Sequence, residues 1–220
     1  MLATKPGFTG AKALFYAMAL GLGGCTALQA PPSRAVFDFG PGPTAPSASA
    51  SADRPAAGAV LVLERVQARA AWEGVAMQYR LAYTDAQQLR PYAQARWSMA
   101  PAELLHQRLR EQLGASRTVL ADGQGVAVPD GSLRLALELE EFSQVFDDAQ
   151  RSVGLVRVQA TLAQRHNGGE RWVAQRSFSV QRPSATPDAS GGAQALRSAT
   201  DALAGELGAW LLAQEARAPR

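Results

Sequence analysis

The chain has few of the residues that build disulfides, metal centres or nucleic-acid interfaces. Its 220 residues include one cysteine, which cannot form an internal disulfide, and two histidines, too few for a histidine-rich metal site. The net charge of +3 is too small to indicate a nucleic-acid-binding protein. No apolar run reaches the ~18–20 residues that a membrane-spanning helix needs. Composition therefore disfavours a disulfide-rich miniprotein, a zinc module, a nucleic-acid-binding protein and a multi-span membrane protein.

Catalytic signatures are also missing. The sequence has neither the G-x-x-x-x-G-K-[ST] loop of an ATPase nor the G-x-S-x-G elbow of a hydrolase. A Ser-His-Asp site would need His106 or His166, which we interpret as a solvated helix residue and a surface-loop residue. Glu138 and Glu140 share one face of a predicted strand, where a solvated sheet surface is the simpler interpretation than a glycosidase-type pair. We expect no catalytic residue, no metal and no non-covalent cofactor.

The most specific segment is the N-terminus. Lys5 and Lys12 precede an apolar stretch over residues 13–22, and two glycines then lead to Cys25. This order of a basic region, a short apolar region and small residues is typical of a secretory signal. Its last four residues, Leu-Gly-Gly-Cys, resemble the bacterial lipobox. A buried structural cysteine and an uncleaved anchor helix remain as alternatives.

The lipobox resemblance implies a covalent lipid. The chain would be cut between Gly24 and Cys25, with a diacylglycerol on the thiol and an N-acyl chain such as palmitate on the new amine. Thr26 is not aspartate, and by resemblance to lipoproteins of two-membrane bacteria this favours the periplasmic face of the outer membrane. Loss of the two signal lysines lowers the net charge from +3 to +1.

Composition divides the chain into three parts. Residues 1–24 are the predicted signal peptide, residues 25–58 a disordered tether rich in Pro, Ala and Ser, and residues 59–215 the folded domain. Within the tether, the alternating residues 36–39 predict a short strand that docks on the domain edge.

Periodicity predicts an α+β domain. Period-two patterns indicate strands near residues 60–66, 75–83, 117–121, 133–142, 156–162 and 172–180. The acidic pair after Leu139 breaks the alternation and predicts a bulge, and residues 166–169 read as a hairpin turn. Apolar stripes indicate a helix from Pro101 to Gly114 and another carrying Leu196, Ala199, Leu203, Leu207, Trp210 and Leu211. We expect a mixed, mainly antiparallel sheet with two helices packed on one face.

The order of several short motifs resembles the ABC-type transport auxiliary lipoproteins, a family that includes paraquat-inducible protein C. The resemblance covers the chain from Phe37 to about Trp210. The matching motifs are Phe37 to Pro41, an aliphatic strand at 61–66, Tyr79-Arg80, Arg96-Trp97 before Pro101, a strand ending in Phe142, Phe178 in a later strand, and Trp210 in the last helix. Phe37 stands where the family usually has tyrosine, and the tether is longer than usual.

The resemblance implies a non-catalytic accessory of a lipid transport system. The partners would be a mammalian-cell-entry (MCE) protein and the ATPase and permease of an ABC transporter, with phospholipid as a candidate ligand and no nucleic acid. Tyr79, Arg80, Arg96 and Trp97 then have two interpretations: fold-stabilising cation–π pairs, or a partner-docking surface. Two other function classes stay open, namely a structural or regulatory lipoprotein of cell-wall or outer-membrane assembly, and a periplasmic hydrolase using Glu138 and Glu140.

Overall fold

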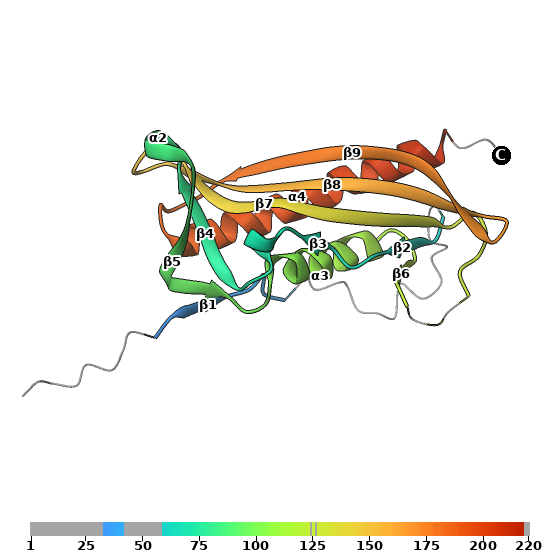
Figure 1. Cartoon of the computed structure of the whole chain (residues 1–220), viewed down its shortest axis with the longest axis horizontal. Helices are drawn as coiled ribbons and strands as arrows, with labels where there is room; N and C mark the ends of the chain where they lie inside the picture. Colours follow the sequence, from blue (N-terminus) through green and yellow to red (C-terminus); the bar gives the residue numbers. More distant parts are fainter. Residues whose placement is uncertain (1–32, 42–58, 124, 126, 218–220) are drawn as a thin grey trace, which may run out of the picture. The chain divides into compact units, whose positions relative to one another are not determined.

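Three long antiparallel strands form the main part of the sheet in the computed structural model, which describes residues 33–41, 59–123, 125 and 127–217 (Figure 1). They are β7 (Leu133–Phe146), β8 (Ser152–His166) and β9 (Gly169–Pro183), each paired with the next. The turn between β8 and β9 has positive φ at Asn167 (50°) and Gly168 (77°), as a tight two-residue hairpin requires. The predicted hairpin is therefore confirmed. The signal segment lies outside the described residues.

The other edge of β7 is shared by three short strands that lie one after another along it. All three run parallel to β7 and pair with its beginning, middle and end. They are β2 (Leu61–Leu63), β3 (Gln67–Ala68) and β4 (Ala76–Leu81). Three further strands extend the nine-stranded sheet, as β6 pairs with β2, β5 with β4, and β1 with β5. They are β6 (Val119–Ala121), β5 (Ala86–Trp97) and β1 (Ala35–Phe37).

Two long helices complete the α+β fold. The first, α3 (Pro101–Gly114), begins at the predicted proline, whose fixed φ suits a first helical turn, and Ala115 rather than Gly114 is its C-cap. The second, α4 (Ala189–Glu215), is capped by Asp188, whose carboxylate accepts the Gly191 N–H at 2.8 Å. Two shorter elements are α2 (Ala82–Asp85) and the 3₁₀ turn η2 (Ala70–Trp72). None of the helices within the described residues has the length and apolar character to cross a membrane.

The core lies between the helices and the inward face of the long strands. The six α4 residues of the predicted stripe are all buried, and Phe178 of β9 packs edge-on against Trp210 at 5.6 Å between ring centroids. The two helices are also joined by a buried ion pair. Arg108, 3% exposed, donates from Nε and Nη2 to Asp201 at 2.6 and 3.0 Å, so its burial is compensated.

Residues 35–39 belong to the folded sheet. β1 pairs in parallel with β5 at an edge of the sheet, which confirms the predicted short strand. Phe39, which follows β1, is buried in the core and contacts Trp97 and Phe142. The division into signal, tether and domain stays a prediction.

Three features differ from the sequence expectation. The strand predicted over residues 75–83 ends at Leu81, because Ala82 and Tyr83 belong to the short helix α2. Strand β5 was not predicted, because its residues are mostly polar and include Pro91. Trp172 was expected to share the buried face of Phe178, but it is 67% exposed. The register shifts where Leu162 pairs with Ala174 and Ala163 pairs with Trp172, leaving Val173 as a bulge. One extra residue reverses the alternation, so Trp172 points away from the helices.

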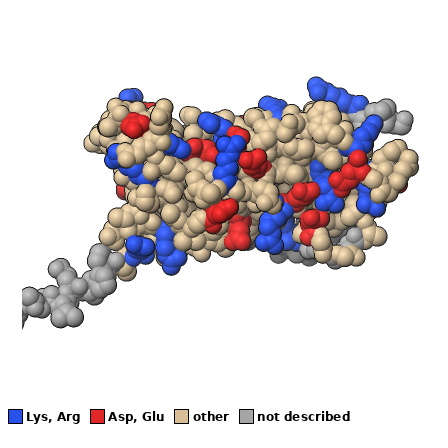
Figure 2. Space-filling view, viewed as in Figure 1, with Lys and Arg blue, Asp and Glu red and all other residues tan. Residues whose placement is uncertain are grey.

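Charges of both signs are interspersed on the visible face of the domain. Figure 2 shows lysine or arginine and aspartate or glutamate side chains scattered among uncharged residues on this face, several of them side by side. Among the described residues, Arg134 contacts Asp122 and Glu170, at 3.0 and 2.5 Å. No broad region of one sign is seen on the face shown in Figure 2.

A close backbone approach between β8 and α4 predicts that alanine substitutions at two glycines have opposite effects on stability. A Cβ on Gly154 would lie 2.5 Å from the Leu196 nitrogen of α4, whereas a Cβ on Gly205 meets nothing within 4 Å. We expect Gly154→Ala to lower the free energy of unfolding by about 1–3 kcal/mol. Gly205→Ala, the matched control, raises it by up to about 1 kcal/mol because alanine favours helix. Chemical denaturation measures both, and equal effects would contradict the packing described.

Candidate functional site

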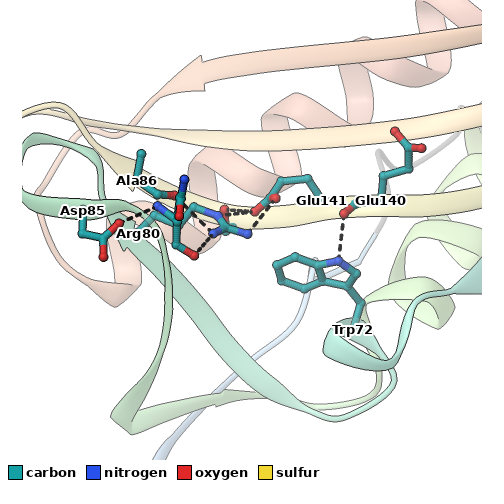
Figure 3. A network of polar contacts seen from close by, with 8 residues as sticks. Trp72, Arg80, Asp85, Ala86, Glu140 and Glu141 are labelled. Atoms are coloured by element: carbon teal, nitrogen blue, oxygen red, sulfur yellow. Dashed lines mark hydrogen bonds and ion pairs between the residues drawn. The ribbon is translucent and has the colours of Figure 1, made fainter.

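Arg80 is the centre of a polar network between the β4–α2–β5 hairpin and strand β7 (Figure 3). Its Nε and Nη2 atoms donate to the two carboxylate oxygens of Glu141, at 3.0 Å each. Its Nη1 atom donates to the backbone oxygens of Ala86 and Gln87, at 3.3 and 3.1 Å. The two side chains are only 20% and 11% exposed. Arg80 therefore joins the start of β5 to the middle of β7.

The predicted bulge places Glu141. The register shifts between Leu139 and Glu141, so Glu140 is the extra residue and Glu141 turns towards Arg80. The Ser143 hydroxyl donates to Glu141 Oε1 at 2.6 Å, and the indole of Trp72 donates to the Glu140 backbone oxygen at 3.0 Å. The acidic pair in the sequence signals this bulge, whereas the pairing of Arg80 with Glu141 was not foreseen.

Glu138 and Glu140 lie on one face, as the alternation predicted. Both bind the exposed Arg69, with its Nε at 3.0 Å from Glu138 and its Nη2 at 3.1 Å from Glu140. The hydrogen bond that Arg69 donates to Glu138 raises the pKa of the Arg69 guanidinium above its ordinary value. Neither carboxylate is deeply buried, and a glycosidase acid needs an environment that raises its pKa. The arrangement fits the ion-paired sheet surface better than a hydrolytic pair.

The aromatic members of the two predicted pairs are packing residues. Trp97 is fully buried, with its ring centroid 6.0 Å from Phe39 and 5.5 Å from Phe142. Tyr79 is half-buried and its ring lies 4.6 Å from Tyr92. The expected cation–π contacts are replaced by these aromatic contacts and by the Arg80–Glu141 ion pair. A cation–π contact occurs instead at Arg176, 4.7 Å above Phe178.

Arg96 is more exposed than Tyr79, Arg80 and Trp97, the other three residues of the predicted docking set. It pairs with Ala76 of β4 and Val36 of β1, and its side chain is exposed. Of the four predicted residues, Arg96 is therefore the one whose side chain a partner can reach without rearrangement. The other candidates, Gly24 and Cys25, lie outside the described residues, and lipidation there stays a prediction.

A second polar network, which the sequence did not reveal, fixes the beginning of α4. The Tyr92 hydroxyl donates to Gln144 Oε1 at 2.7 Å, and Gln144 Nε2 donates to Ser152 Oγ at 2.8 Å. Burial raises the pKa of the Tyr92 phenol. A Cβ on Gly192 would collide with the Gln144 amide, so glycine permits this approach. The signal in the sequence was a glycine pair inside the first turn of a helix, where glycine is otherwise unfavourable.

The two histidines occupy different environments. His166 is exposed at the β8–β9 turn, as interpreted. His106 is half-buried on α3 rather than fully solvated, and desolvation lowers the pKa of its imidazole. Its Nδ1 atom has no hydrogen-bond partner within the described part of the chain. The described residues also contain no group of three ligands suited to a metal ion.

A surface groove lies between β9 and α4. It has a volume of about 640 Å³, and its floor includes Ala174, Ala209 and Trp210. Arg176 and Arg217 contribute charged side chains to its lining. A smaller cavity of about 140 Å³ lies beside Phe39. The groove is open to solvent, which suits a binding surface rather than a closed reaction chamber.

The domain is thus an α+β sandwich in which the polar networks of Arg80, Arg108 and Gln144 join separate elements. The sequence profile of the ABC-type transport auxiliary lipoprotein component family matches residues 42–208. The chain therefore belongs to this family. The family resemblance inferred from the motif order is confirmed.

Solved structures share the fold at low sequence identity. One is protein XCC0632 of family DUF330 from Xanthomonas campestris, at 19% identity and a TM-score of 0.62, covering 84% of this chain and 95% of that chain. Another is an uncharacterized protein at 12% identity and a TM-score of 0.57, covering 81% and 99%. No curated protein matches the sequence.

Removing the negative charge of Glu141 or of Glu140, which lie at the β7 bulge, should lower the stability of the domain by different amounts. Glu141→Gln leaves a mostly buried guanidinium without its counter-charge, and we expect it to lower the free energy of unfolding by about 2 kcal/mol. Glu140→Gln, the matched control, removes a more exposed ion pair with Arg69 and costs less than about 1 kcal/mol. Urea denaturation at neutral pH measures both. A larger loss for Glu140→Gln would show that the Arg80 network is not what holds the hairpin.

Proposed function

We propose that this protein is a lipid-anchored, non-catalytic accessory of an ABC/MCE-type system that moves lipids between the two membranes of a bacterial envelope. The family membership of residues 42–208 is the observation that carries the proposal. The sequence has no phosphate-binding loop, so ATP hydrolysis would belong to other subunits. The engaged polar networks and the open groove fit a protein that binds partners.

We further propose that Cys25 carries the anchor on the periplasmic face of the outer membrane. The Leu-Gly-Gly-Cys sequence supports acylation, and Thr26 supports outer-membrane sorting. Each buried CH₂ group contributes about 0.8 kcal/mol, so the two or three chains of a mature lipoprotein hold it firmly where one chain would not. Such an anchor would keep the domain at the membrane while leaving its surface free for partners.

The anchor is tested by two substitutions at adjacent positions. Cys25→Ala removes the only thiol, and we expect the protein to leave the membrane fraction because no acyl chain can be attached. Thr26→Asp retains the thiol, and we expect the protein to stay lipidated but to move to the inner membrane. Sucrose-gradient fractionation with immunoblotting measures both. Outer-membrane retention of the Cys25→Ala protein would refute the anchor.

The transport role is tested by identifying the proteins that co-purify with this chain. We expect the full-length protein, purified in mild detergent, to co-purify an MCE-domain protein whose gene lies beside its own and beside genes for an ABC ATPase and permease. The control is an unrelated outer-membrane lipoprotein, which is purified in the same way and should not capture the MCE-domain protein. Flanking genes for cell-wall synthesis, with capture of a cell-wall synthase instead, would favour the envelope-assembly alternative and overturn the transport proposal.

A further inference from the structure

Strand β9 presents a free edge. It pairs with β8 along one side, and no other described strand pairs with it. Its pairing with β8 is continuous from Ala174 to Pro183, after the bulge at Val173. Residues 174–182 therefore offer a regular row of backbone donors and acceptors to another extended segment.

The groove described above lies directly beside this edge. Ala174 and Arg176 of β9 line it on one side, and Ala209 and Trp210 of α4 line it on the other. A strand added to β9 would place every second side chain on the groove side of the sheet. Its remaining side chains would lie on the opposite face, where the bulge exposes Trp172.

The charge along this edge is positive and uncompensated. Arg176 and Arg182 are exposed, and neither takes part in the ion pairs formed among the described residues. Arg217 lines the far end of the groove, where Glu206 is the one acidic residue in the lining. Glu170, at the start of β9, is already bound to Arg134. A segment with carboxylates on its groove side would complement this charge.

We propose that β9 is the docking edge for an acidic, extended segment of a partner protein, which adds to the sheet as a further strand. Carboxylates on one side of the segment pair with Arg176 and Arg182, and apolar residues on its other side cover Trp172. Main-chain hydrogen bonds supply affinity, and the two rows of side chains supply specificity. This docking edge does not rest on the transport proposal, since it follows from the β9 edge and its charge.

The test uses the full-length protein in detergent and two synthetic peptides. The probe is a labelled nine-residue peptide of alternating Glu and Val, and the comparison peptide has Lys in place of Glu. We expect the Glu–Val peptide to bind, and hydrogen exchange at residues 174–182 to slow when it is present. Slower exchange distinguishes strand addition from attraction to the arginine side chains alone. Binding of the Lys–Val peptide with equal affinity would overturn the proposal.

Charge-reversing substitutions distinguish binding at the β9 edge from a general effect of the protein's net charge. Combined Arg176→Glu and Arg182→Glu should weaken Glu–Val binding at least about ten-fold. Combined Arg65→Glu and Arg110→Glu, the matched control, makes the same charge change at two exposed arginines away from β9 and should leave binding within about two-fold. Equal losses in the two variants would overturn the proposal. So would concentration-dependent protection of residues 174–182 without peptide, which would show that a second copy of the chain occupies the edge.

Discussion

The packing of α4 along β8 and β9 is the contact on which the rest of this domain depends. The helix covers the inward side chains of both strands, and it reaches β8 closely because Gly154 has no side chain. Asp188 and the Gln144 network fix its beginning, and Trp210 contacts Phe178 near its end. Arg108 then joins α3 to the same helix through Asp201. Both helices are therefore oriented by one sheet face.

Two β-bulges determine which side chains this sheet buries and which it presents. The bulge at Glu140 turns Glu141 towards Arg80, where the carboxylate holds the β4–α2–β5 hairpin. The bulge at Val173 turns Trp172 outward, beside a positively charged strand edge. Bulges often re-aim side chains at functional surfaces. Here one of them stabilises the fold and the other creates an exposed aromatic residue that the core does not require.

The sequence predicted the elements whose apolar residues repeat with a clear period. Local chemistry alone was sufficient to predict three elements. The apolar stripe indicated α4, the proline indicated the start of α3, and the Asn-Gly pair indicated the β8–β9 turn. Strand β5 escaped because its neighbours β1 and β4 bury only a few of its residues, so its sequence carries no alternation. The partner of Arg80 and the face of Trp172 depend on bulges and on distant strands, which periodicity alone does not determine. Arg96 and Trp97 are adjacent in sequence but lie on opposite sides of β5, one at the surface and one in the core.

The shared edge of β7 has a consequence for the order in which the domain folds. Strands β2, β3 and β4 precede β7 in the chain, yet each pairs with it and not with one another. Their hydrogen bonds to β7 can form only after residues 133–146 are available, and the α4 face closes only when the last helix has been made. Such non-local pairing delays folding. A chain predicted to leave the cytoplasm by way of a signal peptide would gain from this delay, because the strands of its N-terminal half are joined into one sheet only after β7 has been synthesised.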